Sequence, residues 1–305
     1  PSRSGSMRGA ASLLAFGVKS TGAVFLHGVV RNSDNIIIGR ASGETALGQY
    51  AMAYRLLMLP ISQINNPLVQ VAVPTLSRLQ DDPQRYRRFY THALLLATTA
   101  GMPLVCGLAL VSGDLIPLVL GDGWDRSVDL FRLLAVPAFL GTFNFATGVA
   151  YVTCDAVGKQ LRWALGAGAV TVTGFVMGIR WGPEGVAVAY ACTSLVLRVF
   201  GIAYCCRWTI PSYADVISGV WRPSVASLVP LAIGAGVLPV IDRAAPTWTG
   251  VTVGLISFLL GYAAVWVLLP GGKSATKSVI ETFRLLKRVG RAGTLPATST
   301  VEVDG

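Results

Sequence analysis

Charged residues are scarce in this chain of 305 residues. Asp, Glu, Lys and Arg make up 13% of it, whereas a soluble globular domain carries about 25%. Hydrophobic residues make up 53%, and the mean hydropathy is +0.59. Several apolar runs approach the ~20 residues that a helix needs to cross a bilayer. The sequence therefore predicts an all-α polytopic membrane protein and excludes a soluble domain.

The cysteines lack the spacing that metal sites require. Cys106, Cys154, Cys192, Cys205 and Cys206 lie singly or as one adjacent pair in or near apolar runs. No CxxC or Cys/His pattern suited to zinc is present. We interpret them as small buried hydrophobic residues. No metal and no cofactor is predicted.

Long polar connections are missing as well, so no loop can house a catalytic domain. A membrane enzyme such as a polymerase or ligase would need a long outer loop with clustered Arg and His. We therefore predict a protein that is not an enzyme and has no catalytic residues. The first ten residues are a short basic flank without a signal-peptide cleavage pattern. Because no Met initiates the chain, we expect it to begin partway through a longer protein.

Hydropathy predicts about eight membrane helices. Their expected ranges are Arg8–Arg40, Glu44–Arg78, Pro83–Val111, Val128–Cys154, Lys159–Met177, Pro183–Trp208, Ser224–Ile241 and Thr249–Leu269. An outer loop, SGDLIPLVLGDGWDR, is expected after the third helix. In the basic tail, TKSVIETFRLLKRVGR fits a helix on the anionic cytoplasmic leaflet or a solvated segment, and residues 292–305 are expected to be disordered.

Connections rich in Lys and Arg alternate with poor ones along the chain. Arg85, Arg87 and Arg88 lie in a rich connection, and Arg126 and Arg180 lie in poor ones. Since basic connections face the cytoplasm, an even number of helices predicts that both termini are cytoplasmic. The net charge of +10 is explained by this asymmetry and predicts no nucleic-acid partner.

The second predicted helix carries a polar stripe at helical spacing. It consists of Gln63, Asn66, Gln70, Pro74 and Ser77. Prolines recur every seven residues on or beside it, and each frees a backbone carbonyl. Inside a bilayer such groups are tolerated only against protein or a water-filled cavity. Interhelical hydrogen bonding is one explanation; amides that could bind sugar hydroxyls on a cavity wall are the other, and we predict the cavity wall.

Charged residues inside the predicted spans are the other candidates. Lys19, Arg31, Arg55, Arg132 and Arg198 fall within spans. We predict that the first three attract an anionic substrate, since the arginine fork binds phosphate bidentately. Pairing between helices or snorkelling to the interface is the alternative.

Asp34 is the one acidic residue well inside a predicted span. We predict it as the group that couples transport to an ion, with His27 second. Alternatively, Asp34 neutralises Arg31 or Arg55, and His27 is simply packed.

Four segments together resemble a known family. They are RNSDNIIIGR, GETALGQYAMAYRLLMLPISQINNPLVQVAVPTLSRLQDDPQRYRRFY, LGDGWDRSVDLFRLLA and WGPEGVAVAYACTSL. In order and spacing they resemble the second half of bacterial polysaccharide flippases, the Wzx-type exporters of the multidrug/oligosaccharidyl-lipid/polysaccharide superfamily. The resemblance covers about residues 8–210 and fades over the last two helices and the tail.

The resemblance implies two six-helix bundles facing each other across a central cavity. It implies alternating-access transport of a lipid diphosphate-linked oligosaccharide, a repeat of exopolysaccharide, O-antigen or capsule, across the bacterial plasma (inner) membrane. Residues 1–210 would form the second bundle, 211–270 an additional helix pair and 271–305 a basic cytoplasmic tail. The first bundle would be missing. The family's cavity cations would correspond to Arg31 and Arg55.

Expected partners are the lipid-linked oligosaccharide, membrane lipids and other polysaccharide-assembly proteins. One alternative is a drug or metabolite exporter of the same superfamily, whose cavity would favour aromatic and acidic groups for cationic drugs. The other alternative is a membrane scaffold that does not transport.

Overall fold

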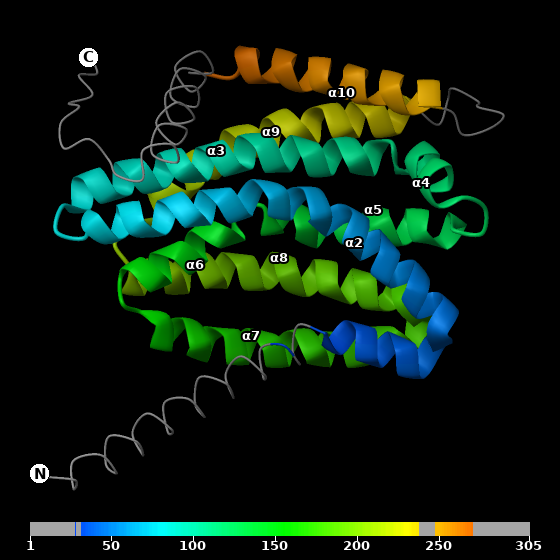
Figure 1. Ribbon diagram of the computed structural model, residues 1–305, viewed down its shortest axis with the longest axis horizontal. Coiled ribbons are helices and arrows are strands. Elements are labelled where there is room, and N and C mark those ends of the chain that lie inside the picture. The colour runs from blue at the N-terminus through cyan, green and yellow to red at the C-terminus, as the bar shows by residue number, and fades with distance from the viewer. Residues whose placement is uncertain (1–27, 29–31, 238–247, 271–305) are drawn as a thin grey trace, which may run out of the picture.

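The structure is a computed structural model that describes residue 28, residues 32–237 and residues 248–270. In these residues it is helical, and the helices lie alongside one another in layers (Figure 1). The helices are α2 (Ser33–Arg78), α3 (Pro83–Leu110), α4 (Ser112–Leu120), α5 (Asp125–Gly141), α6 (Asn144–Thr153), α7 (Val157–Gly178), the 3₁₀ helix η1 (Ile179–Trp181), α8 (Gly182–Trp208), α9 (Tyr213–Val237) and α10 (Trp248–Leu268). The predicted all-α class is confirmed. The tail and most of the first predicted helix lie outside the described residues.

Helix α2 consists of two helices that meet at a sharp break. Gly43 has φ 83° and ψ 176°, a backbone conformation that a residue with a side chain rarely adopts. The chain changes direction there, so that the hydroxyl of Tyr50 reaches the carboxylate of Asp34 at 3.0 Å. The predicted boundaries at Arg40 and Glu44 lie on either side of this break.

Two predicted segments are divided differently in the structure. The expected outer loop after α3 contains α4, because Ile116 packs into the core and gives this short stretch an apolar partner. The fourth predicted helix is split into α5 and α6 between Gly141 and Asn144. Pro137 lacks a backbone donor for the last turns of α5, which weakens the continuous helix before the split.

Helix α9 begins at Tyr213, well before the predicted start at Ser224. Ser212 and Asp215 cap its first turn reciprocally: the backbone N–H of Ser212 donates to Asp215 Oδ2 at 2.7 Å, and that of Asp215 donates to Ser212 Oγ at 3.3 Å. This Ser-x-x-Asp signal lies in the sequence. The prediction was wrong because Arg222 and Pro223 resemble a helix boundary, whereas the structure continues the helix through both.

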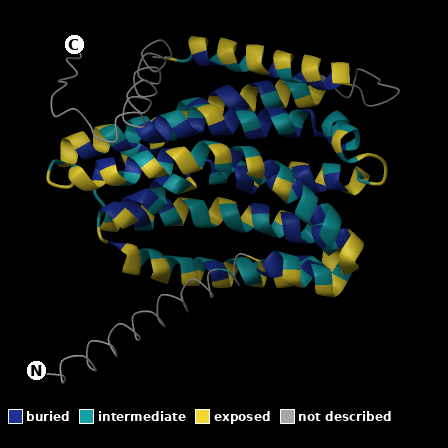
Figure 2. Ribbon diagram, viewed as in Figure 1, coloured by how far each residue is buried: buried dark blue, intermediate teal, exposed yellow. Residues whose placement is uncertain are grey.

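In the described part of the chain, six helical stretches are long and apolar enough to cross a membrane. One of them, Val157–Trp208, holds both α7 and α8, which lie side by side (Figure 1). The predicted number of eight helices is not confirmed. The fold places α7 and α10 at opposite edges, where many residues are exposed (Figure 2).

The core lies between α2, α3, α5 and α8. Tyr50, Leu57 and Phe131 are fully buried in one cluster, and Tyr86 and Tyr90 are buried in a second. Helices α9 and α10 pack on the outer side of α3. Thr98 Oγ1 donates to the carbonyl of Gly219 on α9 at 2.8 Å. This added pair is therefore joined to the other helices through α3.

Helices α7 and α8 are joined by a turn in which two backbones touch. A methyl group on Gly185 would overlap the carbonyl oxygen of Gly178, and one on Gly178 would overlap that of Gly185. Gly182 adds a positive φ of 75°. Glycine is therefore required where α7 and α8 meet.

We expect Gly185→Ala to lower the free energy of unfolding by about 1–3 kcal/mol, because the methyl group must push the two helices apart. Thermal unfolding of the purified protein in detergent measures this. Gly166→Ala is the control, because a methyl there meets no atom within 4 Å and alanine favours the helix. Equal unfolding temperatures for the two variants would contradict the close contact.

Candidate functional site

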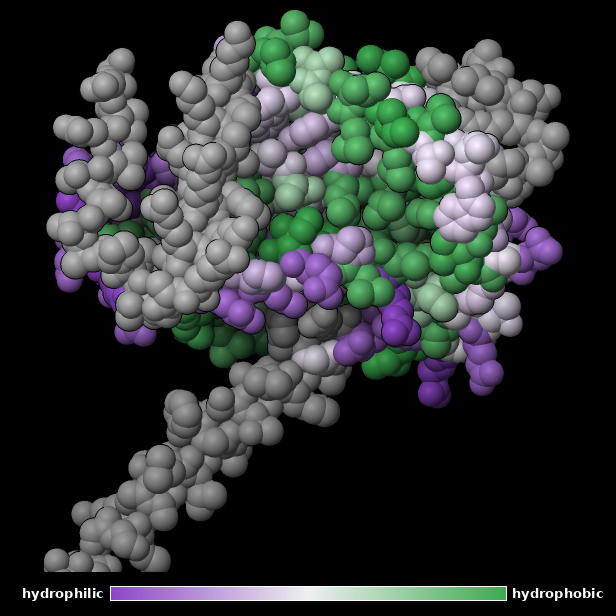
Figure 3. Space-filling model, turned by 45° about the horizontal axis from the view of Figure 1, so that its top comes forward, coloured by the Kyte–Doolittle hydropathy of each residue, from purple (hydrophilic) through white to green (hydrophobic). Residues whose placement is uncertain are grey.

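The polar stripe of α2 lies on the helix face that points away from the other described helices. Gln63, Asn66, Gln70, Pro74 and Ser77 are all exposed. The opposite face is buried and consists of Leu57, Ile61, Leu68 and Ala72. The exposed stripe with Arg55 is called the α2 polar face below. A band of hydrophilic side chains crosses one side of the molecule between apolar surfaces (Figure 3).

Arg55 extends the α2 polar face by two turns toward Gly43. Its side chain is exposed and forms no ion pair with a described residue. The amides of Gln63, Asn66 and Gln70 likewise form no side-chain hydrogen bond to another described residue. A cation and three amides are thus aligned along a membrane helix and remain available to bind a ligand.

Of the other predicted site residues, Lys19, His27 and Arg31 lie outside the described residues. Asp34 is described and buried, with 7% of its surface exposed. Its Oδ2 accepts a hydrogen bond from the Tyr50 hydroxyl at 3.0 Å, and its Oδ1 accepts one from the backbone N–H of Asn35 at 2.8 Å. Among the described residues no cation pairs with it; in particular, Arg55 does not. The structure thus brings Asp34 and Tyr50 together and places Arg55 on a different face.

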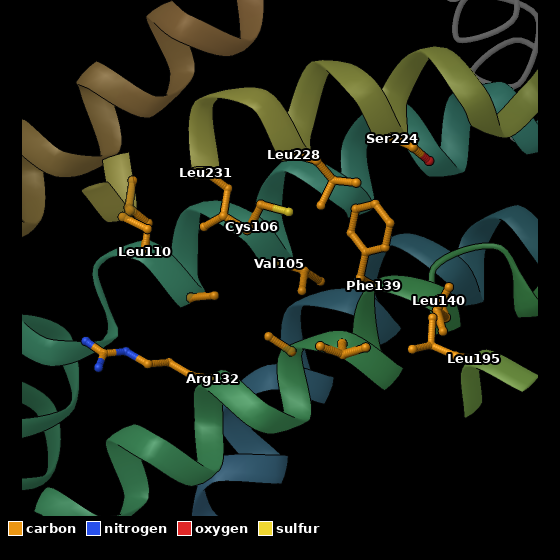
Figure 4. A pocket seen from close by; sticks show the side chains of 14 residues that line it. Val105, Cys106, Leu110, Arg132, Phe139, Leu140, Leu195, Ser224, Leu228 and Leu231 are labelled. Atoms are coloured by element: carbon orange, nitrogen blue, oxygen red, sulfur yellow. The ribbon is translucent and has the colours of Figure 1, made fainter. Parts of the chain in front are cut away.

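A cavity with a volume of about 740 Å³ lies between α3, α5 and α9. Its walls are apolar, with Leu228, Leu231 and Phe139 among them (Figure 4). Arg132 and Ser224 are at opposite ends of the view, and Arg132 Nε donates to Ser112 Oγ at 3.1 Å. The cavity is thus mostly apolar, with the charge of Arg132 at one end.

A second cavity of about 500 Å³ lies among α6, α7 and α8, and its walls carry both polar and apolar side chains. Arg198 and Asn144 lie in it, and neither was predicted from the sequence as a site residue. The signal that could have found them is an arginine in the middle of an apolar span, where a charge is costly. In the sequence Arg198 is only one of five cations in spans, and Asn144 was not considered.

Ion pairs and hydrogen bonds connect the ends of α2, α5 and α8. Arg126 at the start of α5 pairs with Glu184 at the start of α8, with Nη2 and Oε2 2.7 Å apart. Ser127 Oγ donates to the carbonyl of Gln49 on α2 at 3.1 Å. These contacts fix the end of the bundle near Gly43. Among the described residues no group of three or more His, Cys, Asp or Glu side chains could hold a metal ion.

Comparison with known proteins finds similarity to proteins of polysaccharide biosynthesis. Residues 1–129 match the family described as polysaccharide biosynthesis protein. The chain is 22% identical to the lipopolysaccharide biosynthesis protein WzxC of Escherichia coli K12, over 75% of this chain and 47% of that protein. It is 26% identical to the teichuronic acid biosynthesis protein TuaB of Bacillus subtilis, over 69% of this chain and 44% of that protein. The chain thus spans about half the length of the curated relatives it matches.

Two solved structures show the same fold. The lipid II flippase MurJ in an inward closed conformation matches with a TM-score of 0.64 at 14% identity, over 83% of this chain and 54% of that one. An outward-facing multidrug resistance transporter of the MATE family matches with a TM-score of 0.54 at 13% identity, over 88% and 66%. The predicted resemblance to proteins of bacterial polysaccharide biosynthesis, a Wzx protein among them, is confirmed. Both of these solved structures are of transport proteins.

The buried contact between Asp34 and Tyr50 gives a test of this part of the site. Tyr50→Phe removes the hydroxyl that donates to the buried carboxylate, so we expect a loss of about 1–3 kcal/mol in the free energy of unfolding. Thermal unfolding measures it. Tyr213→Phe is the control, since Tyr213 is 44% exposed. An unfolding temperature that is the same for Tyr50→Phe and the control would contradict the contact.

Proposed function

We propose that this chain forms the second bundle of a transporter that moves a lipid diphosphate-linked oligosaccharide across the bacterial plasma membrane by alternating access. In this proposal residues 1–210 are the bundle, 211–270 the additional helix pair and 271–305 a cytoplasmic tail, with both termini cytoplasmic. The proposal is supported by the relatives in polysaccharide biosynthesis and by the fold shared with a lipid II flippase.

The observation that carries the proposal is the α2 polar face. Gln63, Asn66 and Gln70 are exposed and lack partners among the described residues. Facing hydrocarbon, each unsatisfied polar group would cost several kcal/mol. The face therefore has to border water or a second protein surface. A hydrated cavity between two bundles meets this requirement along the whole length of the stripe.

The chemistry of the face suits a sugar diphosphate. The guanidinium of Arg55 can bind a phosphate through two parallel hydrogen bonds. Amides donate and accept at once, as sugar hydroxyls require. The headgroup would cross ~30 Å of hydrocarbon inside this polar space while its lipid tail stays in the bilayer. Lys19 and Arg31 would add positive charge to the same space.

An exporter of cationic drugs fits less well. The α2 polar face carries Arg55 and, between Arg55 and Ser77, no acidic residue. A cation would be repelled there, and a cavity for cationic drugs would instead carry carboxylates and aromatic faces. Asp34 is buried and turned toward Tyr50. We assign it the role of the coupling group that takes up and releases a proton, with His27 as the second candidate.

Charge removal at the two predicted cavity arginines tests the substrate assignment. We expect Arg31→Gln with Arg55→Gln to abolish surface polysaccharide in a strain that lacks the gene, because losing each charged hydrogen bond weakens binding about 10-fold or more. Extracted surface polymer is the measurement. Arg78→Gln is the matched control, since Arg78 is exposed on the same helix at its last turn. Normal polymer from a double variant present at the wild-type amount would favour the scaffold.

The coupling role of Asp34 has a separate test. Asp34→Asn keeps a hydrogen-bond acceptor for Tyr50 but cannot ionise, so we expect folded protein that no longer supports surface polysaccharide. Asp129→Asn, an exposed position on α5, should support polysaccharide normally. The proposal for Asp34 would be wrong if Asp34→Asn restored polymer to the wild-type amount.

A further inference from the structure

The cavity of about 500 Å³ among α6, α7 and α8 combines three kinds of group. Arg198 supplies a positive charge from α8. Asn144 on α6 and Gln160 on α7 supply amides, and Ser194 supplies a hydroxyl. The aromatic ring of Trp163 forms part of the wall. This combination of a charge, amides and an aromatic ring distinguishes this cavity from the apolar cavity beside α9.

Arg198 is incompletely bonded in this cavity. Its Nη1 donates to Asn144 Oδ1 at 2.6 Å, and its guanidinium carbon is 5.2 Å from the centre of the Phe143 ring. Its Nε is buried without a hydrogen-bond partner in the described part. No described carboxylate lies within ion-pair distance, whereas Arg126 has Glu184 and Arg87 has Asp215.

The position of Arg198 in α8 makes its unpaired charge informative. Its neighbours Val196, Val199 and Phe200 are apolar and exposed, as expected for a surface that faces lipid. An ionisable side chain inside a span is costly and marks a functional group by default. Asn144 holds one branch of the guanidinium, which leaves the remaining donors for a ligand. An anion would supply both the missing charge and the missing acceptors.

We propose that this cavity binds the phosphate-bearing headgroup of a lipid-linked saccharide, with the phosphate on Arg198. The inference rests on the proposed function and adds a second binding position to it. The sugar next to the phosphate would meet Gln160, Ser194 and the Trp163 ring. Tyr54 of α2 also lines this cavity, whereas the next residue, Arg55, is exposed and does not line it.

The test measures anion binding without transport. The full chain, as the cell produces it, is placed in phosphatidylcholine nanodiscs. Inorganic pyrophosphate is titrated in one arm, and undecaprenyl phosphate is incorporated in the other. Arg198→Gln should weaken pyrophosphate binding about 10-fold or more, because a charge-assisted bidentate contact is lost. Arg198→Lys should have an intermediate effect, since a point charge remains without the fork.

Two further variants guard against a purely structural effect. Arg162→Gln makes the same charge change at an exposed position of α7 that does not line the cavity, and should bind like the wild type. Ser194→Phe fills the cavity without changing charge, and should weaken binding as Arg198→Gln does. If Arg198→Gln does not fold, Ser194→Phe still decides the question.

The two arms test whether the site exists and also whether its anion is free or belongs to a lipid headgroup. Arg198-dependent binding of free pyrophosphate supports the site. Arg198-dependent binding of undecaprenyl phosphate alone also supports the site and assigns its anion to a lipid headgroup. Wild-type protein that binds neither probe, or binding unchanged in both Arg198→Gln and Ser194→Phe, overturns it. This assay measures binding without transport. Its result is therefore independent of the polysaccharide phenotype of the Arg31 and Arg55 double variant. Arg198-dependent binding in a protein that supports no polysaccharide would overturn the transport proposal alone.

Discussion

A polar group cannot face hydrocarbon without a partner, and this constraint governs the interpretation of every exposed surface here. On three helices it is met simply: α7, α8 and α10 expose apolar side chains such as valine and leucine. On α2 it is not met by the described residues, since the exposed amides of Gln63, Asn66 and Gln70 find no partner. The same constraint applies to Arg198, which faces a polar cavity within the bundle. Both places require something beyond the described helices, whether water, protein or ligand.

The stripe on α2 was predictable because it follows a single helix. A spacing of three and four residues defines one face whatever surrounds it, so Gln63, Asn66 and Gln70 were identified together. The break at Gly43 was also predictable, since glycine and a change of hydropathy coincide there. The predictions relied on local patterns, and local patterns were sufficient for these elements.

The missed features depend on contacts between distant parts of the chain. Ile116 makes α4 a helix by packing into the core, which the loop-like sequence around it does not indicate. Arg198 and Asn144 are 54 residues apart in sequence, and the split between α5 and α6 is what separates Asn144 from the preceding helix. The reciprocal cap of α9 was visible as a Ser-x-x-Asp pattern and was overlooked because Pro223 drew the boundary too late. Tertiary packing decided the first two cases, and a competing local signal decided the third.

The joined backbones of Gly178 and Gly185 limit how α7 and α8 can separate. At that end the two backbones are in contact, so the two helices are held close together. The Arg198 side chain is about 20 Å further along α8. At the far end, the contact is between Lys159 and the ring of Trp208, with Nζ 3.4 Å from the ring centre. If this helix pair widens while the glycine contact holds, the widening is therefore largest at the end beside Lys159.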